Sequence, residues 1–272
     1  FSGSVKRDQE KPNFYKNWEE MIKKGSIDLL VVASNTESHY EICNRAIDLG
    51  VKNILCEKPL SCHLKEAETL IDKAKKNKCV LFVDYFRAFN PSYIELIEKI
   101  KNGFLGRIQS FDAKYSKGIL NNGTHLIDIL VRIFGGIKSA KWIKNPTCSA
   151  SSDDPTVSVL LEFKNGVNGY IHGLNNDYYN IFELDILGEL GRIKITNDKA
   201  ELYLRKKSDI VSGYGILKLI PKADLIGIKE GLYPVYKNIY SCIRSKGKNE
   251  CSGKDALRPL EIADKIMRSI KK

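Results

Sequence analysis

This sequence contains no long apolar run and no ordered arrangement of cysteines. No apolar run approaches the roughly 18 residues that a membrane span needs, and the start Phe1-Ser2-Gly3-Ser4 shows no signal-peptide pattern. The seven cysteines are scattered, and no Cys/His grouping has the spacing of a zinc site. These features argue against a membrane span, a disulfide framework and a zinc module, so we expect a protein of a reducing compartment, the cytoplasm.

A glycine-rich phosphate-binding turn is also missing. A dinucleotide-binding domain normally starts with a strand, a G-x-G-x-x-G turn and a helix, and no such motif occurs in the 272 residues. Either the turn lies upstream of Phe1, or the protein lacks one. We expect the first alternative, an N-terminally truncated domain.

The chain has an excess of positive charge. Its 44 Lys and Arg against 33 Asp and Glu give a net charge of +11. Such an excess fits a lysine-rich surface, a phosphate-bearing ligand or a nucleic-acid partner. The basic pairs, for example Lys23-Lys24 and Lys75-Lys76, are dispersed and form no single stripe with interleaved aromatics. We therefore expect a lysine-rich surface and no nucleic-acid partner.

The first part of the chain alternates between strand and helix patterns. Residues 27–33 and 51–56 form short apolar runs, and a helical pattern over residues 40–49 separates them. Polar clusters follow both runs: Ser34-Asn35-Thr36 after the first and Glu57-Lys58 after the second. Because ligands of parallel α/β sheets bind at the carboxyl ends of the strands, both clusters are expected on one edge of the sheet.

The second part predicts a different sheet. Asn-Gly and Gly-x-x-Gly turns between alternating runs indicate an antiparallel meander. The expected fold is α/β: an incomplete Rossmann-type doubly wound parallel sheet (1–107), then an α+β domain with an open, mostly antiparallel sheet (108–272). Helices are predicted over 18–24 (capped by Asn17), from Ser61, from Pro91, and over 121–134, 232–245 and 254–270; further strands over 79–83, 107–115, 157–163, 167–174, 181–187, 192–196 and 200–205.

Lys58 is the first candidate for chemistry. Pro59 fixes its own φ and restricts Lys58 to extended geometry, at the end of a predicted strand. An ammonium held there can stabilise a developing alkoxide or polarise a carbonyl. The alternative is a solvated Glu57–Lys58 pair that begins a loop.

His125 is the second candidate. At 100° per residue, Asn121, His125, Asp128 and Arg132 form a narrow polar stripe on the predicted helix, opposite an apolar face. A histidine near a helix N-terminus can exchange protons near neutral pH. The same pattern also fits a surface histidine of an amphipathic helix.

The loop before the helix at 40–49 is a third candidate. Asn35, Thr36 and His39 can present side chains and backbone amides to a ligand, or they can simply shape the loop, with Ser38 as the helix cap. His63 and His172 are expected to be structural or exposed.

Several short motifs occur in a characteristic order: Asn35-Thr36-x-x-His39, Glu57-Lys58-Pro59, Phe86-Arg87, Gly103-x-x-Gly106 and Gly123-x-His125-x-x-Asp128. This series resembles the Gfo/Idh/MocA family of nicotinamide-dependent oxidoreductases, from about Trp18 onward. The resemblance implies NAD or NADP as cofactor and a sugar, sugar nucleotide or polyol as substrate. It also implies a homodimer or homotetramer formed through the C-terminal sheet.

The resemblance also implies roles for individual residues. Lys58 and His125 would be catalytic, with Asn121, Lys58 and Arg87 contacting substrate. The cofactor would contact Ser34, Asn35, Thr36, His39, Glu57, Lys58 and Arg87. Many members have an aspartate at the position of Asn121, whose amide can orient an imidazole but cannot stabilise an imidazolium by charge. The alternative function is a catalytically inactive relative that binds a ligand or partner.

Overall fold

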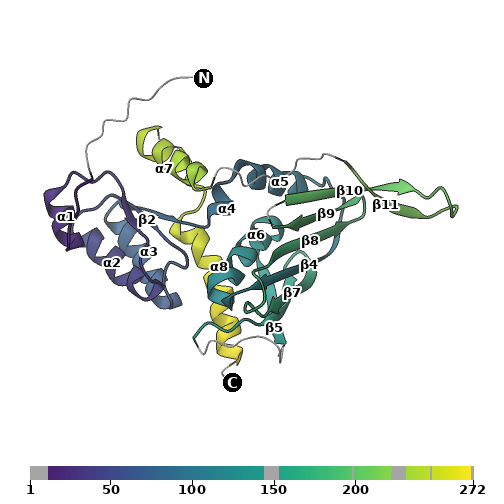
Figure 1. Cartoon of the computed structure of the whole chain (residues 1–272), viewed down its shortest axis with the longest axis horizontal. Coiled ribbons are helices and arrows are strands. Elements are labelled where there is room, and N and C mark those ends of the chain that lie inside the picture. The colour runs from purple at the N-terminus through teal and green to yellow at the C-terminus, as the bar shows by residue number, and fades with distance from the viewer. Residues whose placement is uncertain (1–11, 144–152, 198, 222–230, 246, 271–272) are drawn as a thin grey trace.

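A computed structural model of the chain describes residues 12–143, 153–197, 199–221, 231–245 and 247–270. Its first part is a three-stranded parallel sheet in the order β1-β2-β3, formed by β1 (Leu30–Val32), β2 (Asn53–Cys56) and β3 (Val80–Val83). α2 (Thr36–Asp48) and α3 (Leu64–Lys76) connect the strands, and α1 (Trp18–Lys24) precedes them (Figure 1). This alternation of strand and helix confirms the expected Rossmann-type arrangement.

The helix starts differ from the sequence prediction at two places. α2 begins at Thr36 instead of Tyr40, and the predicted cap Ser38 lies in its first turn, where the hydroxyl donates to the Asn35 carbonyl oxygen at 2.8 Å. α3 begins at Leu64, so Ser61 is not its cap; the Ser61 hydroxyl instead accepts from the backbone N–H of His63 at 3.0 Å. In both cases the polar residues that were expected to form a simple loop and a helix cap make other local hydrogen bonds instead. The α1 cap at Asn17 is confirmed.

The second part is an eight-stranded sheet in the order β11-β10-β9-β8-β4-β7-β6-β5. β4 lies between β8 and β7 and runs parallel to β7, while the remaining pairs are antiparallel, so the sheet is mixed and no simple meander. β5 and β11 were not predicted. The strands are β4 (Ile108–Ser116), β5 (Ile137–Ile143), β6 (Ser158–Phe163), β7 (Asn168–Leu174), β8 (Phe182–Gly188), β9 (Gly191–Thr196), β10 (Lys199–Lys207) and β11 (Gly215–Leu219).

The predicted helix over 121–134 is divided into two elements. A π-helical turn, η1 (Gly118–Gly123), leads directly into α6 (Thr124–Phe134). Every residue of α6 except Arg132 is buried, because α6 lies between the large sheet and other helices (Figure 1). The interpretation of His125 as a surface histidine is therefore wrong.

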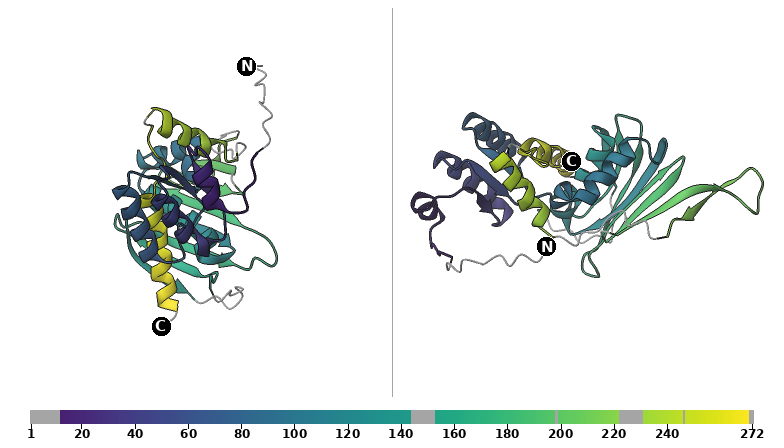
Figure 2. Two further views of the ribbon diagram at one scale, coloured as in Figure 1. Left: turned by 90° about the vertical axis from the view of Figure 1, so that its left-hand side faces the viewer. Right: turned by 90° about the horizontal axis from the view of Figure 1, so that it is seen from above.

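The C-terminal helices tie the two sheets together. α7 (Tyr233–Ser245) and α8 (Gly253–Ile270) lie between the sheets, and α4 (Phe86–Phe89) and α5 (Pro91–Lys101) connect β3 to the second sheet (Figures 1 and 2). Ala256 and Leu260 of α8 belong to the core of the parallel sheet, whereas Ile262 and Ile266 belong to the core of the large sheet. α8 therefore connects both hydrophobic cores. The domain boundary between residues 107 and 108 stays a prediction.

The cysteines of the described residues are free thiols, several of them buried, and Cys148 lies outside the described residues. In the same part of the chain, none of the helices combines the length and apolarity that crossing a bilayer requires.

The core of the large sheet allows a test of its packing. Phe163 is fully buried and contacts Phe111 and Phe134, with ring centroids 5.8 and 5.1 Å away. Phe163→Ala is expected to lower the free energy of unfolding by about 3–5 kcal/mol, because it leaves a cavity in a packed core. Tyr178→Ala, at a side chain that is 80% exposed, should change it by less than about 0.5 kcal/mol. Chemical denaturation measures both, and equal losses would contradict this packing.

Candidate functional site

The carboxyl ends of the three parallel strands bring the polar clusters to one edge. Val32 lies beside Cys56, and Cys56 beside Val83, so the residues that follow these strands are neighbours. The hydrogen bonds continue past the strands, from Glu57 N to Val32 O and from Asp84 N to Cys56 O, both at 2.9 Å. The predicted common edge is therefore present, and Asp84 belongs to it.

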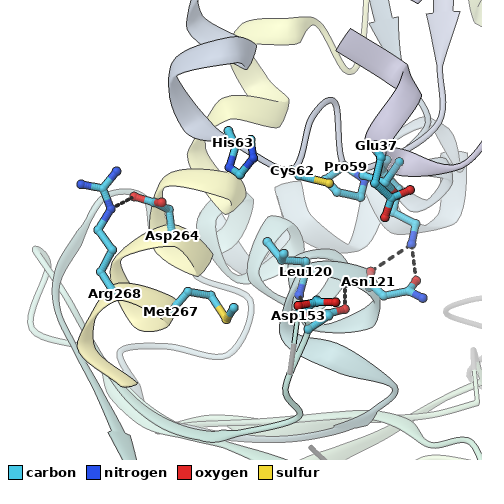
Figure 3. A pocket seen from close by; sticks show the side chains of 13 residues that line it. Glu37, Pro59, Cys62, His63, Leu120, Asn121, Asp153, Asp264, Met267 and Arg268 are labelled. Carbon is cyan, nitrogen blue, oxygen red and sulfur yellow. Dashed lines mark hydrogen bonds and ion pairs between the residues drawn. The ribbon is translucent and has the colours of Figure 1, made fainter. Parts of the chain in front are cut away.

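A cavity of about 520 Å³ opens beside this edge (Figure 3). It lies between the loop that follows β2 on one side and η1 with α8 on the other, so both sheets contribute to it. It is lined by Thr36, Glu37, Lys58, Pro59, Cys62, His63, Leu120, Asn121, Asp153, Asp154, Asp264, Met267 and Arg268.

Lys58 and Asn121 meet in this cavity although 63 positions separate them in the sequence. Lys58 Nζ donates to Asn121 Oδ1 at 2.6 Å and to the Asn121 carbonyl oxygen at 3.0 Å (Figure 3). Burial lowers the pKa of Lys58, and the carboxylates of Glu57 and Asp154 oppose this effect. Lys58 is therefore not part of a solvated Glu57–Lys58 pair. Its ammonium is held between the loop that follows β2 and the turn η1.

His125 lies in the first turn of α6 and is only 6% exposed. Its ring makes edge contacts with Tyr85 and Phe86, at centroid distances of 5.3 and 5.5 Å. Burial, together with the charges of Lys58 and Arg87, holds the pKa of His125 well below 6.5. At neutral pH the imidazole is therefore neutral and can accept a proton. His125 does not belong to the cavity lining.

Arg87 is buried and acts on the same histidine through its charge. Its guanidinium carbon lies 3.7 Å from the ring centroid of Phe182 and 4.4 Å from that of Phe86. Such stacking over aromatic faces stabilises a desolvated cation. Because Phe182 belongs to β8, Arg87 connects the first helix after β3 to the large sheet; it does not line the cavity.

His39 occupies a position different from the one expected. It is 1% exposed, with Nδ1 2.8 Å from the Pro59 carbonyl oxygen and Nε2 3.1 Å from that of Ser34. Both ring nitrogens therefore face the protein's own backbone, and the expected presentation of this ring to a ligand is wrong. His39 instead holds together the loops that follow β1 and β2.

The sequence reasoning missed two acids. Asp84 directly follows β3 on the same edge as Glu57, a placement that the strand pattern could have revealed. Asp154 lies in a loop 33 positions after Asn121 and reaches the site only through tertiary structure. His172, which was expected to be structural or exposed, contacts Asp112 with Nε2 2.7 Å from the carboxylate oxygen, away from the cavity.

The residues at the edge offer hydrogen-bond donors and positive charge to a polar ligand such as a dinucleotide. α2 starts here with Asn35 in the cap position, but the Asn35 side chain makes no capping hydrogen bond. Its first backbone N–H groups and the partial positive charge of the helix N-terminus are therefore available to a polar ligand. Lys58 adds a positive charge to the same edge. The glycine-rich turn that would bind the pyrophosphate does not occur in this sequence.

Comparison with family models identifies both halves of the chain. Residues 4–85 match the model "Oxidoreductase family, NAD-binding Rossmann fold" of Gfo/Idh/MocA. Residues 112–272 match the model "Oxidoreductase family, C-terminal alpha/beta domain" of the same group.

Similar proteins include two inositol dehydrogenases. The chain is 29% identical to myo-inositol 2-dehydrogenase of Thermotoga maritima over 206 residues, which cover 67% of this chain and 60% of the relative. It is 26% identical to inositol 2-dehydrogenase/D-chiro-inositol 3-dehydrogenase of Lactiplantibacillus plantarum over 204 residues, 66% of this chain and 56% of the relative. The matches thus span little more than half the length of these curated relatives.

Solved structures share the fold. Levoglucosan dehydrogenase in complex with NADH and levoglucosan has a TM-score of 0.76 at 19% identity, over 94% of this chain and 82% of that chain. The WlbA dehydrogenase from Bordetella pertussis in complex with NADH and UDP-GlcNAcA has a TM-score of 0.72 at 17% identity, over 94% and 80%.

The Asp84 carboxyl group makes the stability of the site depend on pH. Burial, and next the charge of Glu57, raise its pKa from 3.8 to about 7, and among the residues that the structure describes none forms a hydrogen bond with Oδ1. Since the folded form holds its proton more tightly than the unfolded chain, stability falls as pH rises from about 4 to 7 and is not regained above. Asp84→Asn should remove this loss, with a gain of roughly 1–4 kcal/mol at pH 8 and little gain at pH 4.

Urea unfolding of both proteins at pH 4, 6 and 8 measures this effect. Asp264→Asn, at a cavity residue paired with Arg268 at 2.8 Å, serves as the matched control. A gain of the Asp84 variant that does not grow with pH would show that the carboxyl group is already ionised at low pH.

Proposed function

The chain belongs to the Gfo/Idh/MocA family of oxidoreductases, and on that premise we propose that it serves NAD- or NADP-dependent hydride transfer. The substrate would be a sugar, a sugar nucleotide or a polyol, with a hydroxyl and a carbonyl as the two oxidation states. The observation that carries this proposal is the half-buried Lys58 ammonium, which is hydrogen-bonded to Asn121 and lies near the neutral imidazole of His125. The inositol and levoglucosan dehydrogenases among the similar proteins support the substrate class.

Lys58 would stabilise negative charge on the reacting oxygen. Its ammonium lines the cavity and already binds two neutral oxygen acceptors of Asn121. A substrate hydroxyl that takes up one of these positions would receive a charge-assisted hydrogen bond, which strengthens as alkoxide character develops. Asn121 would orient the ammonium and the substrate.

His125 would accept the proton of the substrate hydroxyl at a ring nitrogen and return it in the reverse direction. The low pKa of the buried imidazole keeps it unprotonated at neutral pH, as a base requires. Because His125 lies outside the cavity lining, substrate binding would have to open a path past Tyr85 or Phe86.

The nicotinamide ring, when bound, supplies the acceptor or donor of hydride. The residues that would hold it are Ser34, Asn35 and Thr36 at the start of α2, together with Glu57 and Lys58. Arg87 would act through its positive charge on the part of the site that holds the nicotinamide ring.

We also propose a homodimer or homotetramer formed through the outward face of the large sheet, in a cytoplasmic setting. That face carries paired charges, among them Asp112 with His172 and Asp185 with Arg192, and the 44% exposed ring of Tyr170. Light scattering during gel filtration measures the oligomeric state.

Removing either proposed catalytic group should greatly reduce turnover. In the full-length protein, Lys58→Ala and His125→Ala are each expected to lower kcat by about 100-fold or more, the scale of lost acid–base or electrostatic assistance. Lys65→Ala, at an exposed lysine near the start of α3, should leave kcat unchanged. Turnover is measured with inositols and sugars, using NAD and NADP; near-normal rates in both variants would end the proposal.

The pH profile tests the state of the imidazole separately. Because burial and the neighbouring cations hold the pKa of His125 well below 6.5, kcat for oxidation should stay constant through pH 6.5 and decline only at lower pH. An acid limb centred at pH 7 or above would show that a different group is the base.

A further inference from the structure

Asp154 binds the start of the turn that carries Asn121. The carboxylate oxygens Oδ1 and Oδ2 accept the backbone N–H groups of Leu120 at 2.7 Å and Asn121 at 3.0 Å. The two preceding N–H groups, of Gly118 and Ile119, donate to Thr156 Oγ1 at 2.9 Å and to the Pro155 carbonyl oxygen at 3.0 Å. Four consecutive donors at the start of η1 are thus satisfied by one short segment that is distant in sequence.

The backbone at Gly118 makes room for this carboxylate. Gly118 has φ +80°, a conformation that favours glycine, and a Cβ atom there would overlap the Asp154 carboxylate. The carboxylate therefore lies directly against the backbone of the turn, so its position and that of η1 depend on each other.

The same turn determines the surroundings of Lys58. Asn121, whose N–H binds Asp154, offers both its carbonyl oxygen and its Oδ1 to the ammonium. Hydrogen bonds therefore run from Asp154 through Asn121 to Lys58 and connect three segments of the chain. Both direct acceptors are neutral, so the ammonium obtains its compensating negative charge from carboxylates farther away.

Two carboxylates and two cations act on this ammonium. Glu57 and Asp154 raise the pKa of Lys58, Lys117 and Arg87 lower it, and burial lowers it most; the remaining nearby base, His125, is neutral. In turn, burial raises the pKa of Asp154, while the two amide N–H groups and the charge of Lys58 favour its ionised form. Glu57 is the neighbour of Lys58 in sequence, but Asp154 comes from the large sheet's side of the cavity.

We propose that Asp154 is a positioning residue for Lys58: it fixes η1 so that Asn121 presents two oxygens to the ammonium, and together with Glu57 it supplies the negative charge that compensates this ammonium in the cavity. The kinetic part of this inference rests on the proposed function; the electrostatic part does not. If Asp154 only capped the turn, its charge would be irrelevant to Lys58.

The test measures the pKa of Lys58 directly, in the full protein without cofactor. Trace labelling of lysines with acetic anhydride between pH 7 and 11, followed by mass spectrometry of the Lys58 peptide, gives this value. Asp154→Asn keeps the shape of the side chain and removes its charge, and it should lower the measured pKa of Lys58 by roughly 0.5 to 1. Asn121→Asp in the same protein restores a carboxylate beside the ammonium and should raise the value again.

Asp264→Asn is the matched control. It removes a carboxylate that also lines the cavity but that is paired with Arg268 at 2.8 Å, so the pKa of Lys58 should not change. Asp154→Ser provides a second uncharged variant in case the amide disturbs folding, which circular dichroism checks. An unchanged pKa of Lys58 in either folded Asp154 variant overturns the inference, whatever the activity.

Kinetics separate this inference from the proposed function. In an active enzyme, Asp154→Asn should lower kcat by about tenfold, which is less than the loss of a transition-state donor itself costs. The KM for the cofactor should not rise. Adding Asn121→Asp to this variant should restore part of the lost kcat. A shifted pKa of Lys58 in a protein that turns over no sugar or polyol would support the role of Asp154 and contradict the proposed function. An unchanged pKa of Lys58 in an active enzyme would contradict the role of Asp154 and support the proposed function.

Discussion

The contact between the Lys58 ammonium and Asn121 is the interaction on which the site depends. It joins the carboxyl end of β2 to the turn before α6, and so connects the parallel sheet to the large mixed sheet. A hydrogen bond to a charged group contributes about 1.5–3 kcal/mol, and leaving a buried ammonium without partners costs at least as much. The two halves therefore cannot separate at this point without exposing the ammonium to water or leaving it unpaired.

Around this contact, burial determines the protonation states. Three positively charged or basic side chains, Lys58, Arg87 and His125, lie close enough to act on one another. The imidazole gives up its proton first, because it is buried and its ordinary pKa is the lowest of the three. Arg87 keeps its charge against the faces of Phe86 and Phe182. The result is an unprotonated base next to two fixed cations, which suits a step in which a hydroxyl loses its proton and its oxygen becomes more negative.

The helix α8 makes this arrangement rigid. Its first half packs against the parallel sheet and its second half against the large sheet, and the chain just before it pairs with β3 through the Phe82–Ser252 bridge. Residues from both ends of the sequence thus form the walls of one cavity. Relative movement of the sheets would disturb two cores at once, so we expect the distance between Lys58 and Asn121 to be well maintained.

The sequence by itself determined the local features: the apolar runs of the strands, the positions of α1, α5 and α8, and Lys58 at a strand end, because these follow from periodicity and from the geometry of neighbouring residues. It also indicated the polar stripe with Asn121 and His125, but not what covers that stripe. Only the tertiary structure decided that β4 lies between β7 and β8, that η1 is a π-helical turn, that His39 binds backbone and that Asp154 reaches Asn121. Each of these depends on segments far apart in the chain, whose contacts form only when the sheets and helices pack, and no local pattern encodes such contacts.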